Sequence, residues 1–324
     1  MKAIRHERYG GPEVLRVVDV PTPTPGPGEV LVRVRAAAVN ARDWHLMRGD
    51  PYLARLSAPE LGSRGPKVTI RGTDFAGVVE AVGPGVERLR PGDAVYGEAN
   101  NAFAEYVVAP EGVVDHKPKN LTFEQAAAVP LAANTALMGL EPVHRGHKVL
   151  INGASGGVGT FAVQIARARG IEVTGVCSSR NLELVESLGA DHVIDYARED
   201  FALSADRYDL VFDLVGNRSL GALRQVLTPT GTLVLSGGGV SRGGSMFGPM
   251  GLMIRGMVAG RLLRQRVSVL VAVPSAANLA TLTGLIESGD VTPIVERTYP
   301  LAEAAAAIRL LEVEHARAKV VLTV

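Results

Sequence analysis

Cysteine is almost absent from the sequence. The 324 residues contain one, Cys177, which excludes an internal disulfide framework and cannot by itself form a thiolate zinc site. An excess of charge is also lacking, because 34 basic and 33 acidic residues give a net charge of +1. This balance gives no electrostatic case for binding nucleic acid or an anionic membrane surface. We therefore expect a globular protein whose partners are small molecules.

The beginning of the chain, MKAIRHERYGG, has neither the apolar core of a signal peptide nor an amphipathic transit pattern, so we expect a cytoplasmic protein. Residues 246–263 are the one stretch that resembles a membrane segment. Arg255 and Arg261 interrupt it and Pro249 breaks it, and each charge near a bilayer centre costs about 2.5–3.5 kcal/mol. We interpret the stretch as a mobile apolar flap or a dimer-facing segment.

The pattern of the chain changes near residue 120. Before it, many short strand-like runs alternate with Gly/Pro turns, as in EVLVRVRAAAV at residues 29–39, which predicts a small β-barrel. After it, apolar strands alternate with amphipathic helices, which predicts a parallel sheet with right-handed crossovers. We expect a helix over residues 126–140, a last sheet strand over 267–273 and a closing strand over 319–324 that returns to the first domain.

The motif around which the chain is organised is KVLINGASGGVGTFAVQIARARG at residues 148–170. It predicts a buried strand, a glycine-rich turn and a helix. Such a turn lets backbone approach a pyrophosphate and directs free helix N–H groups at its charge. It matches G-x-G-x-x-G with alanine in place of the first glycine. We predict dinucleotide binding by Ala154, Ser155, Gly156, Gly157 and Val158. A tight turn without a ligand is the alternative.

Four stretches together resemble the medium-chain dehydrogenase/reductase superfamily. They are GTDFAGVVEAVG at residues 72–83, GV and PGDAV within 85–95, NGASGGVG at 152–159 and LGADHVIDY at 188–196. The chain is most similar to the zinc-free quinone oxidoreductase branch, which includes ζ-crystallin-like proteins. The resemblance implies an α/β protein: a GroES-like β-barrel catalytic domain over residues 1–120 and 274–324, and a doubly wound Rossmann domain with a parallel sheet over residues 121–273.

The resemblance also bears on metal binding. Zinc alcohol dehydrogenases have a cysteine where this chain has Asn40, a histidine where it has Thr73 and a further cysteine near Leu131. Zinc needs a tetrahedral set of N, S or O ligands. We therefore expect no metal.

The residues after the second Rossmann strand predict the cofactor. An NAD-binding protein usually has Asp or Glu there, whereas this chain has Ser178, Ser179 and Arg180. Two hydroxyls and a guanidinium suit the 2′-phosphate of NADPH, which a carboxylate would repel. The resemblance adds Tyr196, which matches a tyrosine that contacts this phosphate. We predict NADPH; in the alternative, Ser178 caps the next helix and Arg180 is solvated.

Without a metal, hydride must pass to an acceptor that is already electrophilic, such as a quinone or an α,β-unsaturated carbonyl. The resemblance places Asn40 beside the nicotinamide and Tyr52 in the pocket, where a phenol can donate a proton. Asp43 is either catalytic or structural, pairing with a base or capping a short helix. For Tyr52 the alternative is a surface role.

Four further positions are candidate cofactor contacts. Thr135 matches a helix-borne threonine near the nicotinamide carboxamide, with core packing as the alternative. Gly237 and Gly238 follow the fifth strand at the carboxyl ends of the sheet, where doubly wound folds bind ligands. Lys319 resembles a C-terminal basic residue near the cofactor in some relatives.

The leading hypothesis is a zinc-independent NADPH-dependent reductase of quinones or activated C=C bonds. An enoyl-thioester reductase, a zinc-free alcohol or aldehyde dehydrogenase, and a non-catalytic NADPH- or RNA-binding module are the alternatives. The near-zero net charge argues against RNA. An apolar strand over residues 267–273 at the sheet edge would invite pairing across a two-fold axis, so we expect a homodimer.

Overall fold

The computed structural model describes residues 1–236, 250–259, 264–313 and 316–324. The chain divides into two compact units, which we describe separately. Unit 1 comprises Met1–Asn134, Val273–Gly289 and Pro293–Val324, and unit 2 comprises Thr135–Ala272 and Asp290–Thr292. We predicted a domain boundary after residue 120, whereas the structure keeps residues 121–134 with unit 1. The reason is that helix α3 (Phe123–Ala127) packs against strands of unit 1.

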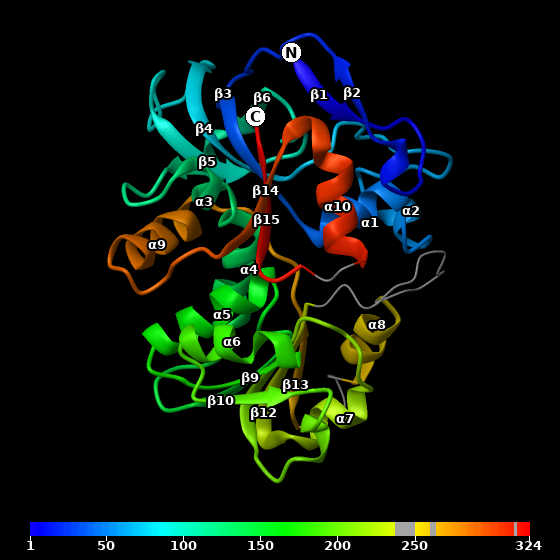
Figure 1. The fold of residues 1–324 in the computed structure, drawn as a ribbon, viewed down its shortest axis with the longest axis vertical. Coiled ribbons are helices and arrows are strands. Elements are labelled where there is room, and N and C mark those ends of the chain that lie inside the picture. The colour runs from blue at the N-terminus through cyan, green and yellow to red at the C-terminus, as the bar shows by residue number, and fades with distance from the viewer. Residues whose placement is uncertain (237–249, 260–263, 314–315) are drawn as a thin grey trace. The chain divides into compact units, whose positions relative to one another are not determined.

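Unit 1 is built on a seven-stranded sheet (Figure 1). Its order is β14-β15-β3-β4-β5-β7, and β6 also pairs with β3. The strands are β3 (Glu29–Val39), β4 (Asp74–Val82), β5 (Ala94–Glu98), β6 (Tyr106–Pro110), β7 (Val114–His116), β14 (Val295–Pro300) and β15 (Lys319–Thr323). Strands β1 (Lys2–Arg5) and β2 (Arg16–Asp19) form a separate two-stranded antiparallel sheet. The C-terminal strand thus lies beside β3, as the sequence predicts.

Strand β3 explains how this sheet is buried. In its first half Arg33 and Arg35 are exposed between buried valines, which is the alternation of a half-buried strand. In its second half four consecutive residues, Ala36–Val39, are all buried. Their small side chains allow Ala37 to lie opposite the fully buried Phe75 of β4. The last residue of the strand, Val39, and the asparagine that follows it, Asn40, therefore lie in the protein interior.

Unit 1 also contains helices. They are α1 (Ala41–Arg48), α2 (Ala54–Ser57), α3, the first half of α4 (Pro130–Gly139), α9 (Ala276–Glu287) and α10 (Ala304–Val313). Of these, α3, α9 and α10 contact the sheet of unit 1. The helix that we expected over residues 126–140 is divided into α3 and α4, because Pro130 lacks the N–H that a continuous helix needs.

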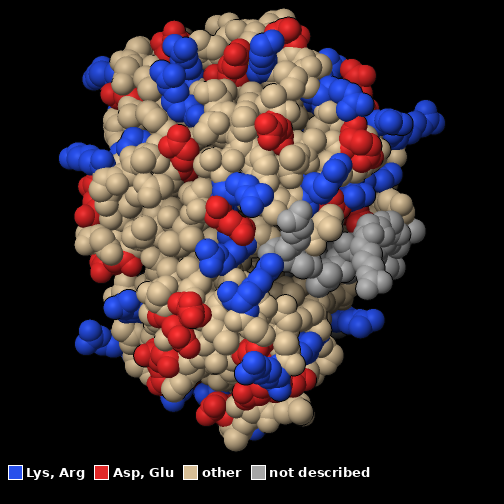
Figure 2. Space-filling view, in the orientation of Figure 1, with Lys and Arg blue, Asp and Glu red and all other residues tan. Residues whose placement is uncertain are grey.

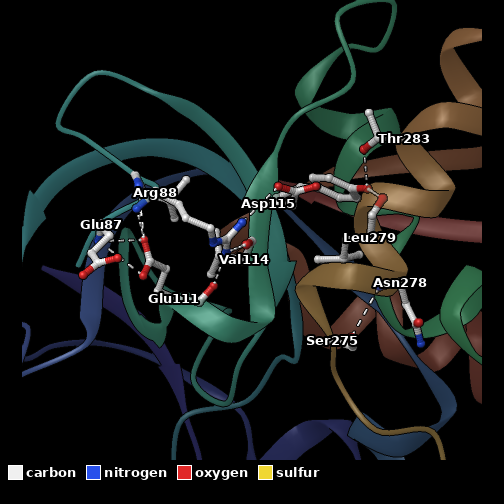
Figure 3. A network of polar contacts seen from close by, with 11 residues as sticks. Glu87, Arg88, Glu111, Val114, Asp115, Ser275, Asn278, Leu279 and Thr283 are labelled. Atoms are coloured by element: carbon white, nitrogen blue, oxygen red, sulfur yellow. Dashed lines mark hydrogen bonds and ion pairs between the residues drawn. The ribbon is translucent and has the colours of Figure 1, made fainter. Parts of the chain in front are cut away.

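A polar network holds β5 and its surroundings in place (Figure 3). The Glu111 carboxylate accepts hydrogen bonds from the backbone N–H groups of Glu87, Arg88 and Leu89. On the other side, the buried Tyr96 hydroxyl of β5 donates to the Leu279 carbonyl of α9 at 2.8 Å. These contacts fix the strand that ends at Glu98.

Unit 2 is an all-parallel sheet of order β10-β9-β8-β11-β12-β13. Its strands are β8 (Lys148–Asn152), β9 (Glu172–Cys177), β10 (His192–Asp195), β11 (Tyr208–Asp213), β12 (Leu227–Leu235) and β13 (Arg266–Val269). Helices α5 (Gly157–Ala168), α6 (Leu182–Ser187), α7 (Leu220–Gln225) and α8 (Met250–Ala259) connect or cover them (Figure 1). The strand order reverses at β8, which is where such folds bind ligands.

The apolar stretch at residues 246–263 lies only partly within the described residues. Its middle forms α8, in which a Cβ at Gly256 would lie 2.9 Å from a Leu235 methyl and 3.1 Å from a Val267 methyl. Helix α8 therefore packs closely on the sheet. No helix in the described part of the chain is long and apolar enough to span a membrane. The ends of the stretch, residues 246–249 and 260–263, lie outside the described residues.

Candidate active site and dinucleotide turn

A cluster of buried polar side chains lies in unit 1 where three strand ends meet. Asn40 directly follows β3, Asp74 begins β4 and Lys319 begins β15. The pairings Ala38↔Asp74 and Val39↔Val320 bring these ends together. Asn40 donates from Nδ2 to Asp74 Oδ2 at 3.0 Å and accepts from Lys319 Nζ at Oδ1. The three side chains are at most 7% exposed. We call this set, with Asp43, Thr73 and Glu98, the buried cluster.

Asp43 has a structural role in the cluster. Its Oδ2 accepts the backbone N–H of Asn40 at 2.8 Å, and so caps the first turn of α1. Its Oδ1 lies 3.4 Å from the Thr73 hydroxyl, which donates to it. Burial raises the pKa of Asp43 to about 6. The helix-capping alternative therefore describes what Asp43 does in this structure; a catalytic role stays untested.

Asp74 and Lys319 form a buried ion pair with an Nζ–Oδ2 distance of 3.6 Å. Asp74 also accepts the Leu131 N–H at 3.1 Å, so several donors surround its carboxylate. Burial raises the pKa of Asp74, and the charge of Lys319 opposes that shift. Burial likewise lowers the pKa of Lys319, and the Asp74 charge opposes it. Each ion is thus kept charged by the other in an environment that disfavours both.

The cluster occupies the positions at which the family resemblance would place zinc ligands. Asn40 and Leu131 hydrogen-bond Asp74, Thr73 hydrogen-bonds Asp43, and the Lys319 ammonium group lies against Asn40 and Asp74. A cation there would repel a second cation, and amide, hydroxyl and backbone N–H groups do not make a tetrahedral zinc set. Within the described residues, no three His, Cys, Asp or Glu side chains are arranged to hold a metal. The residues do not fit zinc.

Tyr52 does not join the buried cluster. Its side chain is 43% exposed, and the Arg55 guanidinium lies 4.5 Å from its ring centroid. Neighbouring Tyr9 is also stacked by Arg55, at 4.2 Å. The surface alternative for Tyr52 agrees with this placement. A proton-donating role stays a prediction.

The glycine-rich turn of unit 2 has the backbone geometry that a pyrophosphate requires. Gly153 has a φ of +93°, and Gly156 is the extended N-cap of the twelve-residue helix α5. A Cβ at Gly159 would lie 2.2 Å from the Gly153 carbonyl oxygen, so only glycine fits there. The first N–H groups of an α-helix have no partner within the helix and suit an anion. The turn therefore fits a dinucleotide.

Ala154 shapes the turn instead of presenting a side chain. It is fully buried, and its N–H donates to the Val176 carbonyl of β9 at 3.0 Å. A Cβ at Gly175 would lie 3.1 Å from the Ala154 Cβ, so the turn and β9 approach closely through small residues. Alanine in place of the first glycine is thus accommodated by packing against β9.

The structure adds two residues that sequence reasoning missed beside the predicted phosphate site. Asn181 is buried and donates from Nδ2 to the Ser155 and Ser178 hydroxyls at 3.0 and 3.2 Å, and so links the turn to the end of β9. The Ser179 hydroxyl donates to Asp195 Oδ2 at 2.5 Å. This hydrogen bond lowers the pKa of Asp195. A carboxylate thus lies close to the site where we expected only donors.

The other predicted cofactor residues have different outcomes. Arg180 is exposed and Tyr196 is 53% exposed, so both can meet a ligand from solution. Thr135 is 6% exposed on α4, and so has the core placement that was the alternative to a nicotinamide contact. Gly237 and Gly238 lie outside the described residues.

Unit 1 also has a surface hollow of about 560 Å³ that three arginines line. Arg5 is paired with Glu7 at 2.8 Å, and Arg16 donates to the Glu13 and Leu15 carbonyls. Because the unit uses two of these guanidinium groups internally, we assign the hollow no ligand.

Comparisons with known proteins identify the family. Residues 26–119 match the alcohol dehydrogenase GroES-like domain, and residues 188–322 match a family described as zinc-binding dehydrogenase. The chain is 33% identical to the NADPH-dependent alkenal/one oxidoreductase of Arabidopsis thaliana over 99% of this chain and 79% of that protein. The chain belongs to the quinone oxidoreductase branch of the medium-chain dehydrogenase/reductase superfamily.

Two solved structures extend the likeness. The quinone oxidoreductase of Coxiella burnetii has a TM-score of 0.87 and 32% identity, with 100% of this chain and 99% of that chain covered. An Escherichia coli quinone oxidoreductase complexed with NADPH has a TM-score of 0.84 and 25% identity, with both chains fully covered. The predicted fold class, a GroES-like domain with a Rossmann-like parallel sheet, is confirmed. The prediction that the chain is an oxidoreductase is confirmed too.

Proposed function

We propose that this chain is a zinc-independent, NADPH-dependent reductase that transfers hydride to a quinone or an α,β-unsaturated carbonyl. Relatives named as quinone and alkenal/one oxidoreductases support the reaction class. The observation that carries the proposal is the presence on one chain of a dinucleotide turn and a buried cluster centred on a lysine instead of a metal. Without a Lewis acid, only an acceptor activated by conjugation accepts hydride readily.

Each part of the chain has a distinct task in this proposal. The bound nicotinamide supplies the hydride. The N–H groups at the start of α5 hold the pyrophosphate, and Asn181 keeps Ser155 and Ser178 in place beside it. In unit 1, Asn40 is held by Asp74 and Lys319 from two sides, so its amide is available in one orientation only. We propose Asn40 and Lys319 as the residues of unit 1 that contact the cofactor.

The choice between NADPH and NADH rests on the end of β9. Arg180 and Ser178 favour a 2′-phosphate. The Arabidopsis relative is named as NADPH-dependent, and the E. coli structure is a complex with NADPH. The ionised Asp195 opposes it by charge, but Arg198, at 3.5 Å from Asp195, offsets that charge. We therefore propose NADPH, with Arg180 and Tyr196 as the groups that meet the phosphate.

Replacing Arg180 by alanine tests this cofactor assignment. We expect the Kd for NADPH to rise about tenfold or more and the Kd for NADH to change less than about threefold, because only NADPH has the 2′-phosphate. Arg207→Ala is the control, since Arg207 precedes β11 at the amino end of the sheet and donates to local carbonyls. Equal weakening of both cofactors in Arg180→Ala would remove the phosphate assignment.

The reaction itself is tested by following NADPH and NADH oxidation side by side, with a benzoquinone and a short enone as acceptors. We expect turnover with NADPH and little with NADH. Tight NADPH binding without turnover on either acceptor would favour an enoyl-thioester reductase or a binding module. Failure to bind either cofactor would refute the assignment of residues 153–159.

The alternative RNA-binding function finds no support in the surface charge. On the face that Figure 2 shows, basic and acidic side chains lie intermixed, and neither sign covers it alone. Nucleic-acid binding needs a concentrated positive surface. A filter-binding assay at physiological salt separates this alternative from the reductase. The cytoplasmic location stays a prediction.

We also propose a homodimer through the edge of the unit 2 sheet. The edge strand is β13, which is shorter than the predicted 267–273 and has half-buried Val267 and Val269. Val271, just beyond it, is 73% exposed. Edge strands with apolar side chains tend to pair with another chain. Light scattering at micromolar concentration should give twice the chain mass; a monomer would disprove the proposal.

A further inference from the structure

Glu98 is a buried carboxyl that no sequence pattern singled out. It ends β5, and the antiparallel register places it directly opposite Asp74 of β4. Directly opposite residues in an antiparallel pair project to the same face of the sheet. Glu98 is 4% exposed and Asp74 is fully buried. Two carboxyl groups from neighbouring strands therefore share one interior site.

The two carboxyl groups have very different surroundings. Asp74 receives hydrogen bonds from Asn40 and Leu131 and lies beside the Lys319 ammonium group. Among the described residues, Glu98 Oε1 has no hydrogen-bond partner. Its nearest cation is Arg42 of α1, at 3.9 Å, and that guanidinium also hydrogen-bonds Glu60. The site is therefore built to stabilise a charge on Asp74 and not on Glu98.

This difference determines the protonation states. Burial, followed by the nearby charge of Asp74, raises the pKa of Glu98 to about 8. Arg42 and Lys319 lower it, and Asp43 raises it further. At neutral pH Glu98 is thus mostly a neutral acid, whereas Asp74 receives the hydrogen bonds and the Lys319 charge that favour a carboxylate. Neighbouring carboxyl groups with opposed environments often have opposite protonation states at functional sites.

The charge of the whole cluster follows from these states. At pH 7 the charges of Lys319, Arg42 and Arg71, a buried neighbour of Asp43, balance those of Asp74, Asp43 and Glu60 when Glu98 is neutral. Ionisation of Glu98 leaves one uncompensated negative charge in a site of low dielectric. Hydride transfer to a quinone or enone places negative charge on the acceptor oxygen, and a net negative site opposes that change.

We propose that Glu98 is a positioning residue of the reductase, which acts in its neutral form through Asp74 and Lys319 so that the buried cluster and the charged groups beside it carry no net charge during hydride transfer. This proposal deepens the proposed function and rests on it. It predicts that the reaction slows at alkaline pH because Glu98 ionises, and not because the cofactor or acceptor changes.

The pH profile of kcat/KM for NADPH-dependent quinone reduction tests the proposal. If only the neutral form of Glu98 supports the reaction, the wild-type value should fall on the order of tenfold or more between pH 7 and pH 9.5. Glu98→Gln keeps the shape of the side chain but cannot ionise. Its kcat/KM should therefore fall less than about twofold between pH 7 and pH 9.5. Glu60→Gln leaves Glu98 as the remaining partner of Arg42, so it should move the fall in kcat/KM to lower pH. Parallel profiles of the wild type and Glu98→Gln would overturn the proposal.

A second measurement does not depend on activity. A carboxyl whose pKa is raised on folding stabilises the fold below its ordinary value, 4.5, and loses that contribution as the pH rises through about 8. The wild type should therefore lose stability relative to Glu98→Gln between these pH values in urea unfolding. If no acceptor is reduced but this difference appears, the proposed function fails and the neutral state of Glu98 stands. If the difference is absent, Glu98 is not held neutral and the inference fails. If Glu98→Gln does not fold, Glu98→Asp takes its place. Its stability should again change with pH, because an aspartate can ionise.

Discussion

Lys319→Met is expected to destabilise unit 1 by about 3–5 kcal/mol, because the variant buries the Asp74 carboxylate without its cation. Lys319 is 2% exposed and Asp74 is fully buried, so water cannot solvate the remaining charge. The loss should appear as a lower midpoint in urea unfolding. Asn40 would also lose the donor to its Oδ1, so cofactor oxidation should fall with stability.

A double-mutant cycle separates the lost ion pair from lost packing. Asp74→Asn alone should also be strongly destabilising, since it leaves the Lys319 ammonium buried without a counter-ion. The double variant Lys319→Met/Asp74→Asn removes both charges and should be more stable than the sum of the single losses predicts, by about 2 kcal/mol or more. Additive losses would mean that the two charges are not coupled and that the cluster is not organised around Lys319.

Gly159→Ala is expected to abolish nicotinamide cofactor binding and to weaken unit 2. The added Cβ would lie 2.2 Å from the Gly153 carbonyl oxygen and 2.7 Å from Ala154 backbone atoms, neither of which is the end of a flexible side chain. The turn must therefore open. We expect the Kd for NADPH to rise at least about 100-fold, or about 2.7 kcal/mol, in a fluorescence titration. A loss of about 2–4 kcal/mol in the stability of unit 2 should accompany it.

Gly156→Ala is the matched control in the same turn. Its Cβ would lie 3.3 Å from the same Gly153 oxygen, and Gly156 has an ordinary φ of −81°, so a small adjustment accommodates it. Its stability should change by less than about 1 kcal/mol. Wild-type affinity in Gly159→Ala would show that the pyrophosphate does not bind this turn.

The comparison of sequence with structure is most instructive at the two predicted sites. The turn at residues 153–159 is a local feature, and glycine spacing between a strand and a helix was enough to locate it. The phosphate site was only partly predictable. Arg180 and Tyr196 stay predictions as phosphate contacts, and Asp195 comes from the next strand, where its hydrogen bond with Ser179 joins residues 16 positions apart.

The interior of unit 1 was less predictable still. Asn40 and Asp43 stood out because they are close in sequence and match a family pattern. Asp74 was part of a quoted motif without a role of its own, and Glu98 carried no signal, because an acidic residue at the end of a short strand is usually solvated. Tyr52 was selected by resemblance, yet it is 43% exposed and lies outside the cluster.

The sequence by itself determined the order of strands and helices, the dinucleotide turn and the family, because these depend on side-chain periodicity and on spacings within a few residues. Only the tertiary structure decided that Lys319 meets Asn40, 279 positions away, and that of two neighbouring buried carboxyl groups Asp74 receives donors and a cation while Glu98 Oε1 receives no hydrogen bond. The physical reason is that protonation depends on burial and on which donors and charges surround a group. Those surroundings come from β3, β4, β5 and β15, which are distant in the chain and adjacent only in the folded sheet.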